Sequence, residues 1–340
     1  MGAPSISVVV ANYNHAHYLP QCLDAIFAQE RPADEVIVID DGSTDDSIAV
    51  IERYRQAQPT LRLVRHMPNQ GVIAVMNRGV QEARGDYLLF AAADDWMLPS
   101  LLARSMDLLQ RHPQAALCSS LSLKLTDDAA SPTPLPTAVV LDQPGYIPPA
   151  DVLRLLSRED SWFLGNTIVI RRDAVIEMGG YRPELTSFCD GFVYQQTALK
   201  YGACFIPEAL AVWRLLGGGY SATSMINVER VAAIREHVSR LMAGEFRQLF
   251  PTNYARRWQR RWTCAALNGA LRGGNCDTGT LARLWPDAGV IDRAVVICAA
   301  SAGRVGARFG VLYLTLRLRL ADLPTLVLRR LAWKIRAGGG

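Results

Sequence analysis

The sequence lacks the patterns that mark several common classes of protein. Its seven cysteines are scattered and have no C-x-x-C spacing, so we expect neither a disulfide framework nor a zinc site. No G-x-G-x-x-G follows the first apolar run and no G-x-x-x-x-G-K-[ST] is present, which disfavours NAD(P) and P-loop chemistry. The five histidines have no metal-ligand spacing such as H-E-x-x-H, and we expect them in loops or at the surface.

Long apolar runs and targeting segments are also absent. The uncharged apolar stretch 294–303 falls well short of the ~20 residues that span a bilayer. The N-terminus enters a strand-like run at Ile6 without the basic and apolar regions of a secretory signal, so we expect a cytoplasmic protein. A net charge of +4 gives no indication of nucleic-acid binding.

The first third of the sequence alternates strand-like and helix-like segments. We expect strands at 6–11, 35–40, 61–65, 86–91 and about 115–121, and helices at 18–28, about 45–57, about 72–83 and about 99–111. This alternation predicts βαβ units and a mostly parallel central sheet flanked by helices. With 340 residues, half of them hydrophobic, the chain can bury a large core.

The alternation breaks after residue 121. The Pro-rich stretch 126–149 is interpreted as a surface loop. Beyond it we expect a short helix, a strand at 166–170, a helix from Asp173, a helix at about 190–201, and short strands near 203–206 and 210–214. The chain then reads as helical from about 228 to the end. We therefore predict an α/β domain over 1–225 and a helical C-terminal region over 226–340.

Polar residues stand where the expected strands end. In alternating strand–helix folds, ligands bind at the carboxyl ends of the parallel strands. The residues at such ends are Asn12, Asp40, Asp41, Asp94 and Asp95. A carboxylate at the position of Asp41 can accept a hydrogen bond from a base imide or a ribose hydroxyl. Ser43, Thr44, Asp45 and Asp46, in contrast, are typical of an ordinary helix start.

Two adjacent carboxylates, Asp94 and Asp95, follow the small residues 91–93. They repel each other unless a cation compensates them, and Mg²⁺ or Mn²⁺ favours one or two carboxylates together with phosphate oxygens. The alternative for this pair is the cap of the helix that begins near Pro99. Asp190 opens another expected helix, and taken alone it is best interpreted as a helix cap.

Taken together, the segments ISVVVANYN, EVIVIDDGSTDDS, NQGVIAVMNRG, GDYLLFAAADDW, GGYRPEL and CDGF resemble the family 2 glycosyltransferases with the GT-A fold, in family order, over roughly residues 4–225. The resemblance implies a Rossmann-like GT-A domain with a nucleotide-binding half over about 1–120 and an acceptor half over about 150–225. It implies an inverting transfer of a sugar from a nucleotide-diphosphate-sugar, by family expectation UDP-linked, to a hydroxyl of a saccharide or lipid-linked acceptor. Surface polysaccharide or glycolipid assembly is the implied setting.

The same resemblance implies roles for individual residues. Asp41 would contact the nucleobase, Asp94 the ribose or diphosphate, and Asp95 a Mn²⁺ or Mg²⁺ ion. Asp190 would be the catalytic base. Asn12, Asp40 and Asn77 would complete the nucleotide-sugar site.

The sequence departs from the family pattern at several positions. Ala92 replaces the first aspartate of the D-x-D-D pattern that many relatives carry. Met76 precedes Asn77 where many relatives have arginine, and Cys189 precedes Asp190 where relatives often have glutamate. Leu216, next to Trp213-Arg214, stands in place of a histidine. The run 217–221 is either a loop that closes over the donor or a plain turn.

Two other functions remain as alternatives. A nucleotidyltransferase would build a nucleotide-sugar on a similar sheet, but such enzymes usually have a Gly-rich basic loop where this chain reads ANYNHAHY. A non-catalytic relative would keep the sheet as a nucleotide-sugar-binding module. The presence of both Asp95 and Asp190 disfavours it.

The C-terminal tail is basic. Residues 303–336 carry many arginines and one lysine against the single acid Asp322, and 325–336 has an apolar helical face opposite a basic one. This pattern is typical of a helix that lies in an anionic membrane interface. It fits equally a helix packed on the catalytic domain. The first interpretation predicts a peripheral protein at the inner face of the plasma membrane.

Overall fold

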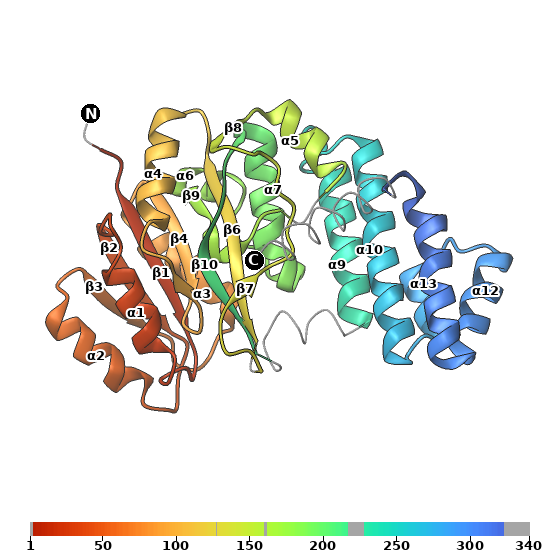
Figure 1. Ribbon diagram of the computed structural model, residues 1–340, viewed down its shortest axis with the longest axis horizontal. Helices are drawn as coiled ribbons and strands as arrows, with labels where there is room; N and C mark the ends of the chain where they lie inside the picture. The colour runs from red at the N-terminus through yellow and green to blue at the C-terminus, as the bar shows by residue number, and fades with distance from the viewer. Residues whose placement is uncertain (1–2, 127, 160–161, 217–227, 323–340) are drawn as a thin grey trace. The chain divides into compact units, whose positions relative to one another are not determined.

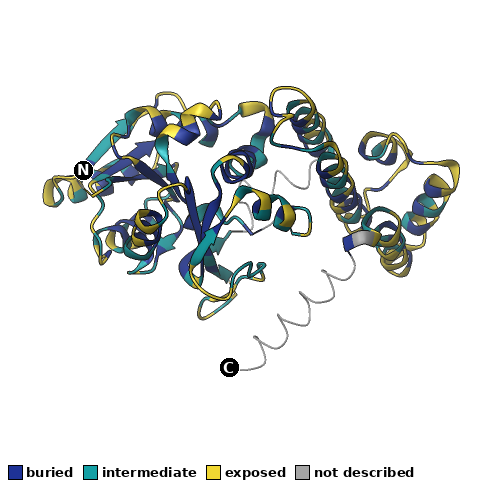
Figure 2. Ribbon diagram, turned by 90° about the horizontal axis from the view of Figure 1, so that it is seen from above, coloured by how far each residue is buried: buried dark blue, intermediate teal, exposed yellow. Residues whose placement is uncertain are grey.

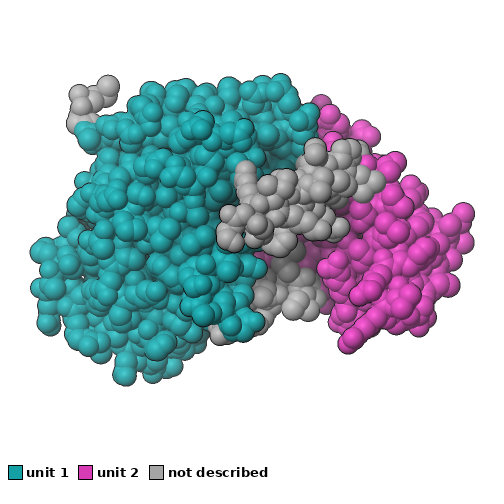
Figure 3. All heavy atoms as spheres, in the orientation of Figure 1, with its two compact units in different colours: residues 1–183, 189–216 teal, residues 184–188, 217–340 magenta. Residues whose placement is uncertain are grey.

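The computed structural model describes residues 3–126, 128–159, 162–216 and 228–322. Two compact units divide the chain: unit 1 comprises 1–183 and 189–216, and unit 2 comprises 184–188 and 217–340. Figure 3 colours them separately. This division falls at 216, nine residues before the expected boundary at 225, and it also assigns 184–188 to unit 2. The expected closing loop at 217–221 and the expected tail helix at 325–336 lie outside the described residues.

Unit 1 is built on one sheet with strands in the order β3-β2-β1-β4-β9-β6-β10-β5, and β7 and β8 pair with β6 and β10 (Figure 1). Its strands are β1 (Ile6–Asn12), β2 (Glu35–Asp40), β3 (Leu61–Arg65), β4 (Tyr87–Ala92), β5 (Trp96–Met97), β6 (Leu117–Thr126), β7 (Thr133–Pro134), β8 (Gly145–Ile147), β9 (Val169–Arg171) and β10 (Ala203–Leu215). The strands β3-β2-β1-β4 are parallel, as predicted, whereas β9 joins β4 and β6 in antiparallel pairing.

Helices flank the sheet, which confirms the predicted fold class. They are α1 (Leu19–Phe27), α2 (Ser47–Ala57), α3 (Val72–Glu82), α4 (Leu101–Arg111), α5 (Pro149–Leu156), α6 (Arg172–Glu177) and α7 (Cys189–Tyr201). Short 3₁₀ turns occupy η1 (Gly165–Thr167) and η2 (Pro183–Phe188).

The strand β1 is buried on both faces, as its continuous apolar run predicts for a parallel strand. Val8 and Val10 join the core formed with α1 and α4. Val9 points to the other face, against Gly79 of α3, where an added Cβ would lie 2.7 Å from Val9 Cγ1. The helix packs this closely only because position 79 lacks a side chain. Figure 2 shows the strands of this sheet in the colour of buried residues.

The second half of unit 1 differs from expectation in detail. The two short strands expected near 203–206 and 210–214 form a single strand, β10, with irregular register between Ile206 and Ala211. Pro207 and Glu208 interrupt the apolar pattern at this point, and the chain accommodates them by a bulge. The strand expected at 166–170 begins only at Val169, after the turn η1, and the loop 126–149 contains β7 and β8.

Unit 2 is helical over its described residues from 228, as predicted. It contains α9 (Val228–Ala243), α10 (Thr252–Gly273), α11 (Thr278–Leu284), α12 (Val290–Ser301), α13 (Gly303–Arg319) and the 3₁₀ turn η3 (Leu320–Asp322). Its own apolar core includes Leu267, Leu271, Val296 and Leu314. Phe188 also belongs to this unit and packs against the rings of Trp258 and Trp262. No helix within the described residues is long and apolar enough to cross a bilayer.

Candidate active site

The carboxyl ends of β1, β2 and β4 lie side by side in the sheet. Asn12 pairs with Asp40 across β1 and β2, and Ala11 pairs with Ala92 across β1 and β4. The N–H of Asp41 donates to Asn12 O at 2.9 Å. The polar residues expected at these strand ends therefore share one edge of the sheet.

Asp40 and Asn12 close the turn after β2. The Asp40 carboxylate accepts hydrogen bonds from Asn12 Nδ2 at 2.7 Å, from the Ser43 hydroxyl at 2.6 Å and from the Ser43 N–H at 3.0 Å. Gly42, between them, has a φ of +79°, a conformation that a residue with a side chain adopts only under strain. Asp40 is thus engaged with the protein itself and fixes the shape of the edge, while Asn12 Oδ1 is buried without a partner among the described residues.

Asp41 holds the loop that follows β3. Its Oδ1 accepts from His66 Nδ1 at 2.8 Å and from the Gln70 N–H at 2.9 Å, and its Oδ2 accepts from the Gly71 N–H at 2.8 Å. Each carboxylate oxygen can accept two hydrogen bonds, so Oδ2 keeps the capacity for one further donor. Asp41 is 3% exposed.

His66 lies at this edge, although no pattern in the sequence indicates it. It lies in a loop, as expected, but it is buried beside Asp41 instead of lying at the surface. Its partner is 25 residues away in the chain, so no local spacing could reveal the pair. Only its position directly after the β3 strand, next to the same sheet edge, could have indicated it.

Asp94 and Asp95 follow β4 in the tight turn after Ala93. Asp95 is buried, and its Oδ1 accepts from the Arg214 N–H at 2.8 Å. Burial and the neighbouring negative charge of Asp94 raise the pKa of Asp95 well above its usual value. No residue of the described chain hydrogen-bonds Asp95 Oδ2, and Asp94 remains half-buried.

Arg214 is a second residue of the site that no sequence pattern indicates. Its Nε donates to Asp94 O at 3.1 Å, and its Nη2 donates to Gln21 Oε1 at 2.7 Å. Its guanidinium lies 4.7 Å from the ring centre of Tyr18 and 5.1 Å from that of Trp96. A fixed cation therefore stands beside the two aspartates, on β10, next to the position where relatives often have a histidine.

The turn η1 connects Asp190 with the surroundings of Asp95. Asn166 and Asp95 line one small cavity, which Cys22 of α1 also lines. Next to Asn166, a Cβ added to Gly165 would lie 3.1 Å from Asp190 Oδ2. The residues 165–166 thus connect the surroundings of Asp95 with those of Asp190.

The carboxylate of Asp190 is held loosely compared with that of Asp41. Its Oδ1 accepts from the adjacent Gly191 N–H at 2.7 Å, which is not the bond to the second or third helical residue that defines a helix cap. Desolvation by burial raises the pKa of Asp190 above the ordinary aspartate value. The buried side chains Tyr181, Cys189 and Tyr194 lie nearby and contribute to its apolar surroundings.

Asn77 contacts the protein with both ends of its amide. Its Nδ2 donates to Tyr181 O at 2.7 Å, and its Oδ1 accepts from the Tyr181 N–H at 2.9 Å. Gly180, with a φ of +70°, lies against the same amide. Asn77 therefore joins α3 to the segment that leads into α7, and through it helps to position Asp190.

The residues at the Asp94–Asp95 turn fit a divalent cation. No group of three or more histidine, cysteine, aspartate or glutamate side chains is arranged to hold a metal ion within the described ranges. Magnesium and manganese sites that are completed by substrate phosphates need only one or two carboxylates. Asp95 is buried, its Oδ2 has no partner among the described residues, and its negative charge is repelled by that of Asp94, so it matches that requirement.

Part of the chain is similar to known glycosyltransferases. Residues 7–145 match the family described as "Glycosyl transferase family 2". Among curated relatives, the putative glycosyltransferase EpsH of Bacillus subtilis is 31% identical over 119 residues. That match covers 35% of this chain and 34% of EpsH, so the aligned part is about a third of the relative's length.

Solved structures share the fold. The structure of Staphylococcus aureus TarS 1–349 in complex with UDP has a TM-score of 0.56 and 17% identity, over 88% of this chain and 92% of that one. The mannosyltransferase PcManGT of Pyrobaculum calidifontis, in complex with GDP-Man and Mn²⁺, has a TM-score of 0.53 and 20% identity, over 95% of this chain and 88% of that one. At these identities the similarity shows the fold alone.

Proposed function

We propose that this chain transfers a sugar, with inversion, from a nucleotide-diphosphate-sugar to a hydroxyl acceptor, because residues 7–145 match glycosyl transferase family 2. The observation that carries the proposal is the sheet edge where Asp41 and the Asp94–Asp95 pair lie, with Asp190 reached through Gly165–Asn166. TarS is described in complex with UDP and PcManGT with GDP-Man, which supports a nucleotide-linked donor. We propose a uridine-linked donor and an acceptor used in surface polysaccharide or glycolipid assembly.

The donor would lie along the edge from β2 to β4. The remaining acceptor capacity of Asp41 Oδ2 suits the imide N–H of a base. Asn12 and Asp40 keep the edge in shape beneath it. Asp94, half-buried beside Arg214, suits the ribose or the diphosphate.

Asp95 would hold a Mn²⁺ or Mg²⁺ ion together with the donor diphosphate. When bound, such an ion supplies Lewis-acid stabilisation of the charge that develops on the departing diphosphate. Arg214 provides a fixed positive charge at the same place, since its guanidinium is held by Asp94 O, Gln21 and the two aromatic rings.

Asp190 would act as the general base. Its carboxylate takes the proton of the acceptor hydroxyl while that oxygen forms its bond to the anomeric carbon. The bond from the anomeric carbon to the diphosphate oxygen breaks, and its electron pair leaves with the nucleoside diphosphate. The raised pKa of Asp190 makes it a stronger base than an exposed aspartate.

The test is a panel of nucleotide-sugars with Mn²⁺ or Mg²⁺, scored by the nucleoside diphosphate released, on the native protein, Asp95→Ala and Asp190→Asn. We expect Asp190→Asn to lower kcat by about 10²–10⁴-fold with little change in donor KM. Asp95→Ala should lower turnover and remove its dependence on the metal ion. Turnover that neither substitution changes would contradict the assignment, and formation of a nucleotide-sugar from a sugar phosphate would favour the nucleotidyltransferase alternative.

The same assay gives a pH test. Only the ionised carboxylate can take the proton, and the pKa of Asp190 is raised. We therefore expect kcat/KM to fall as the pH drops through that raised pKa, above the value of about 3.9 typical of an exposed aspartate. The acid limb should disappear in Asp190→Asn, measured on its residual activity.

A further inference from the structure

The outer face of α13 is an exposed apolar stripe. Its residues follow one another at intervals of three or four, so they lie on one side of the helix. Most large apolar side chains of a folded chain are covered, yet Val305 is 79% exposed and Phe309 59%. The members of the stripe are Val305, Phe309, Leu312 and Leu316 of α13 and Leu320, the first residue of η3.

The apolar surface continues onto α12. A hollow between the two helices is lined by Ala294, Val295, Cys298, Ala299 and Ala302 on one side and by Val305, Gly306 and Phe309 on the other. The helices approach closely at Gly306, where an added Cβ would lie 2.3 Å from Ala299 O. The start of α12 adds two further exposed apolar side chains, Val290 and Ile291. Together these residues form the α12–α13 face.

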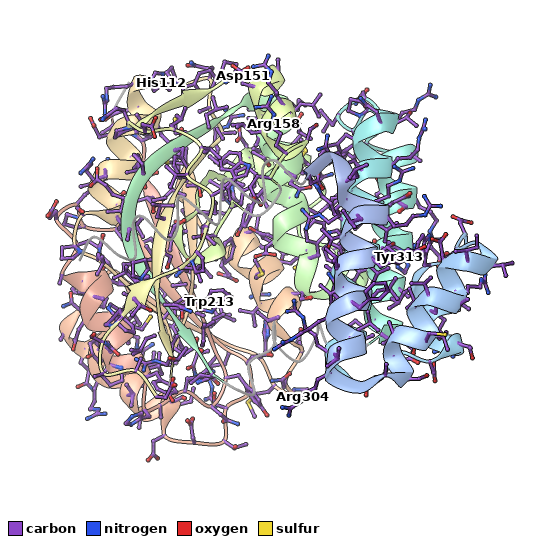
Figure 4. The ribbon with its side chains drawn as sticks, turned by 45° about the vertical axis from the view of Figure 1, so that its right-hand side comes forward. His112, Asp151, Arg158, Trp213, Arg304 and Tyr313 are labelled. Atoms are coloured by element: carbon purple, nitrogen blue, oxygen red, sulfur yellow. The ribbon has the colours of Figure 1, made fainter. Side chains whose placement is uncertain are left out.

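The exposed charges of this face are positive. The sequence 290–320 contains five arginines and one carboxylate, Asp292. Asp292 is buried and accepts hydrogen bonds from the Tyr313 hydroxyl and Arg317. Arg304 and Arg308 are exposed one turn apart along one edge of the stripe, and neither forms an ion pair within the described part of the chain. Figure 4 shows Arg304 near the start of α13 and Tyr313 farther along it.

We propose that the α12–α13 face docks on an anionic lipid bilayer. An apolar helical stripe bordered by arginines matches the interface of such a membrane, where apolar side chains enter the acyl boundary and arginines meet the lipid phosphates. The face lies within folded helices of unit 2 and is separate from the tail residues 325–336, which the sequence singles out. It extends the function of the chain beyond sugar transfer and does not depend on it.

Two other partners for the α12–α13 face complement its positive charge less well. A second copy of this chain, packed on the face about a two-fold axis, would bring the same arginine edge against itself. The chain's own residues 323–340 carry Arg329, Arg330, Lys334 and Arg336 and no acid, so they too would oppose Arg304 and Arg308. A surface of negative charge is the complementary partner.

The test is cosedimentation of the full chain with vesicles of phosphatidylcholine alone and of phosphatidylcholine with phosphatidylglycerol. We expect binding to the anionic vesicles only. Phe309→Glu/Leu312→Glu should abolish it, whereas Ile176→Glu, at an exposed apolar position in unit 1, should not change it. Arg304→Gln/Arg308→Gln should weaken it about thirtyfold at low salt, since each basic residue near an anionic surface contributes about a factor of five. The control Arg53→Gln/Arg84→Gln removes the same charge from unit 1.

A tail variant separates the possible sources of binding. It replaces Arg329, Arg330, Lys334 and Arg336 by glutamine in the full chain. Anionic binding that survives in this variant and is lost in the α13 variants supports the proposal. The proposal is overturned if the native chain does not bind, or if only the tail variant loses binding. It is also overturned if Phe309→Glu/Leu312→Glu converts a dimer to a monomer in sedimentation velocity while vesicle binding persists.

Discussion

Single carboxylates of the site differ in how tightly the protein holds them. Asp41 accepts hydrogen bonds from three N–H groups of the protein and is fixed in place. A fixed carboxylate suits a residue that would recognise the hydrogen-bonding groups of a nucleobase. Asp190 accepts from its neighbouring N–H and its Oδ2 faces Gly165. A base that must take up a proton and turn toward an acceptor requires such freedom. A substitution that fills the small space beside Asp190 Oδ2 should therefore lower activity without unfolding the chain.

Gly165→Ala tests this point. The added methyl group would lie 3.1 Å from Asp190 Oδ2, so the carboxylate must shift by a few tenths of an ångström. We expect kcat to fall about tenfold with donor KM unchanged, because small misplacements of a reacting group slow the chemical step. Steady-state kinetics with the donor found in the panel would measure it.

A matched substitution controls for the general effect of replacing glycine. Gly269 lies within α10, and a Cβ there meets nothing within 4 Å. Gly269→Ala should leave kcat unchanged and stabilise the helix by about 0.5–1 kcal/mol. Equal losses of kcat in both variants would show that space beside Asp190 is not the cause.

The parallel strands β1 to β4 and the helices between them could be predicted closely, because the sequence patterns that indicate them are local. β-branched runs, helix periodicity and polar strand ends gave β1 to β4 and the positions of Asp41 and Asp95. The antiparallel half could not be predicted as well. β9 is only three residues long, and β10 continues through Pro207 and Glu208 because pairing with β6 on either side of the bulge holds it together. Arg214 reaches the site from that strand, so its role depends on a register that no local pattern records.

The end of α13 is held to α10 by one buried carboxylate. Asp322, 3% exposed, accepts hydrogen bonds from Arg257, Arg261 and Arg319. Despite the cost of burial, these arginines lower the pKa of Asp322 to about 2. Asp322→Asn would leave three arginines facing a neutral group, and we expect unit 2 to lose about 3 kcal/mol of stability. Chemical denaturation followed by tryptophan fluorescence would measure the loss, since Trp258 and Trp262 lie on α10.

The same carboxylate makes a pH prediction. Because its folded pKa lies below the unfolded value of about 3.9, its contribution is present above that pH and is lost as the pH falls from about 4 toward 2. The difference in unfolding free energy between the native chain and Asp322→Asn should therefore shrink over this window. A difference that stays constant down to pH 2 would contradict the assignment.

Across the whole chain, the candidate site gathers residues from segments that are far apart in sequence. The strand ends near residues 12, 41 and 95 could be placed on one edge from the sequence, because parallel strands end together. The contributions of His66, Asn166 and Arg214 could not, because they depend on how loops and β10 fold back onto that edge. All of these residues lie in unit 1.

The location of the candidate site within unit 1 predicts how ligand binding affects the stability of each unit. Because the residues that we propose to bind the donor belong to unit 1, UDP with Mn²⁺ should stabilise unit 1 and leave unit 2 unchanged. At a hundredfold excess over Kd, bound ligand stabilises the folded state by about 2.7 kcal/mol. Hydrogen exchange read by mass spectrometry should show slower exchange in β1, β2 and β4 and no change in α10 or α13. In Asp95→Ala the protection from exchange that requires Mn²⁺ should disappear. Protection that spreads equally over both units would contradict a site confined to unit 1.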